Sequence, residues 1–173
     1  MCSLIRPGAI ALAVCALAAC GGGGGGGSNQ PSTRTIRGSH FVFQAPFAWH
    51  VRRRGSEVGA APKPIAPELV SVSIFPLLQA YRPALFAAVR HELDGDARQL
   101  ATRLGGTVER SATAIVAGIR SRQYELLYSS GGHDFHQRIT FVLRGKTEFQ
   151  LLCRWTGSEP SACAQLEQTF RPF

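Results

Sequence analysis

Residues 107–155 read TVERSATAIVAGIRSRQYELLYSSGGHDFHQRITFVLRGKTEFQLLCRW. Apolar, β-branched and aromatic residues recur along this stretch, and glycines interrupt it at short intervals. Runs of this kind predict strands, and glycine between them favours hairpin turns. We therefore predict a meander of antiparallel strands. The predicted strands are 107–116, 119–128, 135–143 and 148–155, with turns at Gly118, at Gly131 with Gly132, and at Gly145 with Lys146.

An amphipathic helix is predicted immediately before this meander. Between Arg82 and Leu104 the apolar period changes from two to about four, which is typical of a helix that packs on a sheet. Pro83 suits the first turn, and Gly105 suits the end. Gly95 leaves open whether the helix is continuous, kinked or split. The apolar stripe consists of Leu85, Val89, Leu93, Ala97, Leu100 and Leu104.

Three further strands are predicted before the helix and a short helix after the meander. The strands are 40–43, 49–53 and 69–75, with a loop rich in Gly, Ala and Pro at 55–67 and a stop at Pro76. Pro160 starts the terminal helix. The order is βββ-α-ββββ-α, so we predict an α+β fold in which helices pack against an antiparallel sheet of about six to seven strands.

The first 38 residues predict export and attachment to a membrane. Leu17-Ala18-Ala19-Cys20 follows a short apolar run and resembles the bacterial lipobox. We expect a signal peptide at 1–19, a lipidated Cys20 opening a Gly-rich flexible tether at 20–38, and a single domain at 39–173. Acyl chains on Cys20 would bind membrane lipid and hold the domain on the extracytoplasmic face. An ordinary signal peptide that contains cysteines is the alternative.

Two cysteines lie in the predicted domain. Cys2 and Cys15 lie within the signal and Cys20 takes the lipid, which leaves Cys153 and Cys163. An exported domain folds where disulfides persist, so an even remainder favours one bridge. Two free buried thiols, or a metal pair that lacks its other ligands, are the alternatives.

The chain is basic, with 19 Lys and Arg against 11 Asp and Glu. The arginines are scattered along the sequence, and stacking motifs typical of RNA-binding domains are absent from it. We therefore expect no nucleic-acid partner. A generally solvated basic surface is the plainer explanation, although an exported protein meets anionic lipid and wall polymers first.

The domain resembles the PsbP-like (PsbP/DcrB) superfamily, which includes bacterial lipoproteins. The resemblance rests on the element order and on the stretches FQAPFAW at 43–49, VAGIRSRQY at 116–124 and FVLRG at 141–145. It covers about Ser39 to Phe173. It implies an α/β/α sandwich and a non-enzymatic docking or accessory domain, and in related short lipoproteins the last strand and helix carry a cysteine pair.

Other patterns predict no catalytic, metal or cofactor site. Gly145-Lys146-Thr147 lacks the first glycine of a phosphate-binding loop. His133 and His136 point to opposite faces of a strand. His91 and Asp94 at helical spacing are too few for a cation site, and core packing explains Phe47 and Trp49 better than a ligand groove does.

We accordingly expect a lipid-anchored binding or accessory module of the cell envelope that is not an enzyme and binds an unidentified envelope protein. The alternative is an extracytoplasmic carrier of a small ligand that uses a cleft beside the 55–67 loop.

Overall fold

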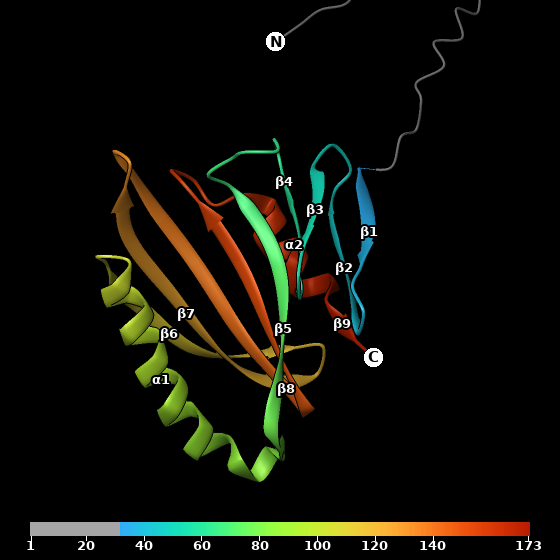
Figure 1. Ribbon diagram of the computed structural model, residues 1–173, viewed down its shortest axis with the longest axis vertical. Helices are drawn as coiled ribbons and strands as arrows, with labels where there is room; N and C mark the ends of the chain where they lie inside the picture. The colour runs from blue at the N-terminus through green and yellow to red at the C-terminus, as the bar shows by residue number, and fades with distance from the viewer. Residues whose placement is uncertain (1–31) are drawn as a thin grey trace, which may run out of the picture. The chain divides into compact units, whose positions relative to one another are not determined.

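The computed structural model describes residues 32–173, which form two sheets and two α-helices (Figure 1). The elements are β1 (Thr33–Arg37), β2 (Phe41–Pro46), β3 (His50–Arg54), β4 (Glu57–Ala61), β5 (Leu69–Tyr81), the 3-10 turn η1 (Pro83–Leu85), α1 (Phe86–Arg103), β6 (Thr107–Val116), β7 (Ile119–Ser130), β8 (His133–Trp155), α2 (Ser161–Thr169) and β9 (Arg171–Pro172).

The larger sheet has six antiparallel strands in the order β3-β4-β5-β8-β7-β6. The smaller sheet has the order β1-β2-β9. α1 packs on one face of the larger sheet, whereas α2 and the smaller sheet lie on its other side (Figure 1). The predicted α+β fold, with helices packed against an antiparallel sheet, is confirmed.

Apolar layers fill both faces of the six-stranded sheet. The larger layer joins β1, β2, β4, β5, β8 and α2, and four aromatic rings lie at its centre. Phe41 packs against Phe43, Phe149 and Phe170 with ring centroids 6.1–6.3 Å apart. The second layer joins the stripe of α1 to β7 and β8. Residues of the central strand β8 contribute to both layers.

The turn predicted at Gly145 and Lys146 is wrong, because β8 is one strand of 23 residues. Its first half pairs with β7, and its second half pairs with β5. Phe141 packs under α1, whereas Phe149, eight residues later, packs in the opposite layer. The left-handed backbone at Gly145, with φ of 56°, lies between them. The strand continues in the same direction beyond the glycine, but the side chains that would have faced one layer face the other.

Two predicted irregular segments contain strands. β1 occupies 33–37, so the folded domain begins before residue 39 and the tether prediction is wrong for those residues. β4 occupies 57–61 and pairs with β3 and β5, so the predicted loop at 55–67 is wrong there. A Cβ atom at position 59 would lie 2.7 Å from the carbonyl oxygen of Val70, which is too close. Glycine therefore allows β4 to pair closely with β5 at this point. The irregular segment beside which a small-ligand cleft was predicted is therefore shorter, at 62–68.

The predicted stop at Pro76 is wrong, and the open question about Gly95 has an answer. β5 continues through Pro76 to Tyr81. Its pairing with β4 ends at Ser73, so the missing N–H of Pro76 leaves no hydrogen bond to β4 unmade. α1 runs without interruption through Gly95, which settles the question of a split.

Cys153 on β8 and Cys163 on α2 form the disulfide that the sequence predicts, with Cα atoms 5.4 Å apart. Both residues are buried in the larger apolar layer. The bridge therefore ties the terminal helix to the long strand, and the alternatives of free thiols or a metal pair do not apply.

Glu167 of α2 is a largely buried carboxylate whose pKa is raised by that burial. Its Oε1 accepts hydrogen bonds from Gln123 Nε2 at 2.8 Å and Thr140 Oγ1 at 3.2 Å. A raised carboxylate pKa contributes stability that is present at low pH and is lost as pH rises through the folded-state value. The ionised carboxylate therefore destabilises the domain at neutral pH.

We expect Glu167→Gln to remove this pH dependence. The variant should be at least as stable as the parent near pH 7.5, and the parent should gain stability relative to it as pH falls toward 4. Urea unfolding of both proteins across this range measures the difference. Glu109→Gln, at an exposed position of β6, is the matched control. A constant difference across the range would contradict the prediction.

Candidate functional site

Two adjoining cavities lie between α1 and the larger sheet. Their volumes are about 280 and 340 Å³, and Asp96 and Glu148 line both of them. Because they share these residues, we treat them as one groove, the α1 groove. α1 packs on the β7 side of the sheet, so the groove opens over β5 and the second half of β8.

The floor of the α1 groove is apolar. Tyr124 and Leu126 of β7, with Ile139 and Phe141 of β8, form one end. Leu143 lies at the other end, where the exposed part of β5 forms a wall. This combination suits an apolar side chain better than a polar metabolite.

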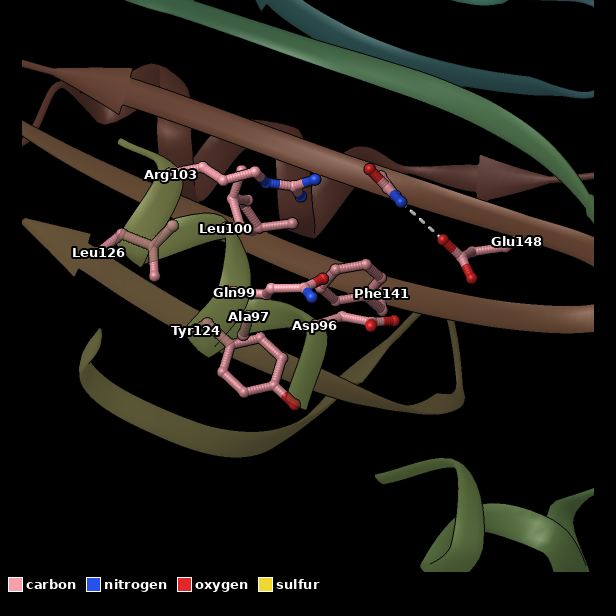
Figure 2. A pocket seen from close by; sticks show the side chains of 11 residues that line it. Asp96, Ala97, Gln99, Leu100, Arg103, Tyr124, Leu126, Phe141 and Glu148 are labelled. Atoms are coloured by element: carbon pink, nitrogen blue, oxygen red, sulfur yellow. Dashed lines mark hydrogen bonds between the residues drawn. The ribbon is translucent and has the colours of Figure 1, made fainter. Parts of the chain in front are cut away.

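Carboxylates line the sides of the groove. Glu92 and Asp96 come from α1, and Glu148 comes from β8. Figure 2 shows Asp96 and Gln99 beside the ring of Phe141, with Glu148 on its other side. Gln150 Nε2 donates a 2.7 Å hydrogen bond to Glu148 Oε1 and so orients that carboxylate. Arg103 adds one positive charge, so the groove is acidic on a basic domain.

Asp94 attaches α1 to β7 beside the groove. Its Oδ1 accepts hydrogen bonds from Tyr124 Oη at 2.6 Å and from Arg122 Nε at 2.9 Å. Partial burial opposes ionisation, but these bonds outweigh it and hold the pKa of Asp94 below its usual range. Burial and the bond to Asp94 raise the pKa of Tyr124, which remains a donor. The position of α1 thus depends on an ionised Asp94.

We expect Asp94→Asn to lower the free energy of unfolding at pH 7 by about 1 kcal/mol, because a neutral amide oxygen accepts hydrogen bonds from Tyr124 and Arg122 more weakly than a carboxylate does. A depressed carboxylate pKa contributes stability that is present above about pH 4 and is lost as pH falls further. The difference should therefore shrink between pH 5 and 2. Urea unfolding measures it. Asp96→Asn, two residues along the same helix, should show little change, and an equal loss in this control would contradict the assignment.

The other residues considered from the sequence do not form a site. Asp94 accepts hydrogen bonds from Arg122 and Tyr124, whereas His91 is exposed. His136 stacks on Trp155 with ring centroids 5.6 Å apart. The side chains described for residues 32–173 include no group of three or more His, Cys, Asp and Glu that could hold a metal ion.

Phe47 and Trp49 lie between β2 and β3, away from the α1 groove. Phe47 is partly exposed beneath the guanidinium of Arg34, and Trp49 packs against the larger apolar layer. Cys20 lies outside the described residues, so its lipidation stays a prediction. Within the described part of the chain, the helices are too short or too polar to cross a membrane.

The α1 groove was missed in the sequence because its parts come from separate elements. Glu92 and Asp96 stand at helical i, i+4 spacing beside the apolar stripe, which was an available signal. The predicted turn at Gly145 gave no reason to place Glu148 beside the helix. Its place beside α1 depends on the exchange of faces along β8.

The domain has an α+β fold of the PsbP-like kind. The solution structure of cyanobacterial PsbP (CyanoP) from Synechocystis sp. PCC 6803 is similar, with a TM-score of 0.60 and 13% identity over 91% of this chain and 99% of that one. A crystal structure from Bacteroides thetaiotaomicron VPI-5482 is similar with a TM-score of 0.59 and 11% identity. It matches 82% of this chain, which spans about half, 48%, of that protein.

A weaker similarity, with a TM-score of 0.48 and 13% identity, joins 80% of this chain to 88% of LpqN of Mycobacterium tuberculosis, a protein involved in cell envelope biogenesis. No family model matches the sequence, and no curated protein matches it. At these identities the similarities to PsbP and to the Bacteroides protein show a shared fold.

Proposed function

We propose that this chain is a lipid-anchored lipoprotein of the cell envelope whose non-enzymatic domain binds a segment of another envelope protein in the α1 groove. The observation that carries the binding site is the groove itself, with its apolar floor and its three carboxylates. The bound segment would be apolar and basic, because opposite charge stabilises a complex and selects its partner.

Two features support an extracytoplasmic location. The lipobox-like stretch that ends at Cys20 is typical of exported lipoproteins. The disulfide between Cys153 and Cys163 is typical of proteins that fold in an oxidising compartment. Neither feature depends on the similarity to PsbP.

A defined peptide tests the groove. We expect an 18-residue amphipathic peptide of leucine and lysine to bind the domain in a fluorescence polarisation titration. A leucine and glutamate peptide of the same pattern should bind at least about tenfold more weakly, a difference of 1.4 kcal/mol. The domain is basic overall, so a preference for the cationic peptide reports the local charge of the groove.

Two neighbouring alanines of α1 provide a matched pair of variants. Ala88 lines the groove, and Ala87 is exposed elsewhere on the helix. Both Ala88→Arg and Ala87→Arg add one positive charge, but only the first fills the groove. Ala88→Arg should weaken binding of the cationic peptide about tenfold, and Ala87→Arg should change it little. Equal effects, or equal binding of the two peptides, would exclude the groove as this binding site.

Intact-mass analysis of the membrane-extracted protein tests the anchor. The expected mass is that of a chain that begins at Cys20 and carries acyl groups. Cys20→Ala should move the protein out of the membrane fraction. An unlipidated mass at the membrane would contradict the anchor but leave the groove experiment unaffected.

A further inference from the structure

Five arginines lie early in the described chain, on two short strands. Arg34 and Arg37 lie on β1, and Arg52, Arg53 and Arg54 lie on β3. β1 and β3 are edge strands of different sheets. Arg53 joins them, because its Nη1 donates a 2.9 Å hydrogen bond to the carbonyl oxygen of Arg37. We call these five residues the basic end.

The arginines of the basic end are accessible. Every residue of β3 is exposed, including Arg52, Arg53 and Arg54. Arg37 is exposed beside the ring of Phe173, and Arg34 is partly exposed over Phe47. Nε of Arg34 is buried, so the guanidinium groups that can reach a surface laid against the two strands are chiefly those of the other four arginines.

The positive charge of the protein is concentrated at this end. Residues 32–67 contain six basic residues and one acidic residue, whereas residues 68–173 contain twelve basic and ten acidic residues. In the second segment, Arg122 and Arg138 form ion pairs with acidic residues. At the basic end the described ion pair is the one between Arg52 and Glu57, at 3.2 Å. Net positive charge is therefore higher in the segment that contains the basic end than in the rest of the described chain.

Protection of sheet edges explains only part of this pattern. Charged side chains on edge strands prevent edge-to-edge aggregation. Charges of either sign serve that purpose, yet the two edges carry five arginines. The planar guanidinium of arginine also binds a phosphate group through two parallel hydrogen bonds, whereas the ammonium of lysine acts as a point charge.

The position of the basic end relative to Cys20 favours a membrane as its partner. β1 begins at Thr33, thirteen residues after Cys20. Even a fully extended chain of this length reaches only about 45 Å. Under the proposed function, an acylated Cys20 would keep the basic end close to lipid headgroups. A polybasic patch adds an electrostatic contact to attachment by acyl chains.

We propose that the basic end docks the domain on an anionic lipid surface. The arginines contact the lipid phosphates, and β1 and β3 face the bilayer. α1 lies on the opposite side of the domain from these strands (Figure 1). Docking through the basic end therefore directs the α1 groove away from the membrane, toward partners in the envelope.

Vesicle binding tests this proposal without the anchor. The protein is residues 20–173 with Cys20→Ser, which retains every described element and cannot be acylated at that position. We expect it to cosediment with phosphatidylcholine vesicles that contain one quarter phosphatidylglycerol, at least about tenfold more strongly than with phosphatidylcholine alone. Binding should decrease as salt is raised from 50 to 500 mM because the attraction is screened.

Paired arginine variants locate the contact. Arg53→Ser with Arg54→Ser should weaken binding to the anionic vesicles at least about tenfold, since each arginine at the surface contributes roughly a fivefold factor. Arg90→Ser with Arg98→Ser, on exposed positions of α1, removes the same charge and should weaken it about twofold or less. Circular dichroism should show both variants folded.

Three results would overturn the proposal. They are equal binding to neutral and anionic vesicles, equal losses in the two paired variants, and tighter binding to a single-stranded oligonucleotide than to anionic vesicles at the same phosphate concentration. The last result would make nucleic acid the partner. Each is independent of the Ala88 and Cys20 experiments, so the docking surface can fail while the proposed function stands.

Discussion

Replacing Phe41 by alanine is expected to lower the free energy of unfolding by about 3–5 kcal/mol. The Phe41 ring is fully buried and contacts the rings of Phe43, Phe149 and Phe170. These residues come from β2, β8 and the end of α2, so the cavity would lie where the two sheets and the terminal helix meet. Surrounding strands cannot collapse into it without losing their pairing.

Urea or thermal unfolding measures the effect of Phe41→Ala. Domains of this size have total stabilities of about 5–15 kcal/mol, so the variant should be marginally folded at 37 °C. Phe75→Ala is the control, because Phe75 is 41% exposed on β5 and should cost about 1 kcal/mol or less. Similar losses in the two variants would mean that the ring cluster is not the centre of the core.

Loss of the disulfide is expected to produce the second large effect. The bridge closes a loop of ten residues, and the chain-entropy relation gives about 2.5–3 kcal/mol for a loop of that size. Replacing both Cys153 and Cys163 by alanine should lower the free energy of unfolding by about this amount. Since the bridge joins α2 to β8, the helix should exchange its amide protons faster in the variant.

Chemical reduction provides the control for the disulfide. A strong reductant should lower the unfolding midpoint of the parent protein and leave that of the double alanine variant unchanged. Because both cysteines are buried, alkylation of the native protein without reductant should label neither of them. Rapid labelling, or a parent protein insensitive to reductant, would show that the thiols are not paired.

Local patterns predicted those elements whose sequence determines their conformation directly. The four-residue period from Leu85 to Leu104 predicted α1, and the stripe residues Leu93 and Ala97 are buried on β7 and β8. Alternation of apolar and polar residues predicted the buried part of β5. Periodicity succeeds in these cases because burial of one face dictates both the spacing and the backbone geometry.

Elements were missed where glycine and proline suggested a break in the chain. β4 contains Gly59, and a central strand accepts glycine there because the backbone of β5 approaches closely. Gly145 has the left-handed backbone of a turn, yet it changes only the face of β8. Residues 33–37 do not predict a strand, because their polar sequence forms β1 only through pairing with β2.

The sequence alone determined the α+β class, the long helix, the predicted export signal and the two cysteines available for a bridge, because each depends on residue types at short range. The existence of the α1 groove and of the basic end is evident only from the tertiary structure. Glu92, Asp96 and Glu148 meet because β8 exchanges faces at Gly145. Arg37 of β1 and Arg53 of β3 meet although their strands belong to separate sheets, and such contacts between distant segments leave no periodic signal in the chain.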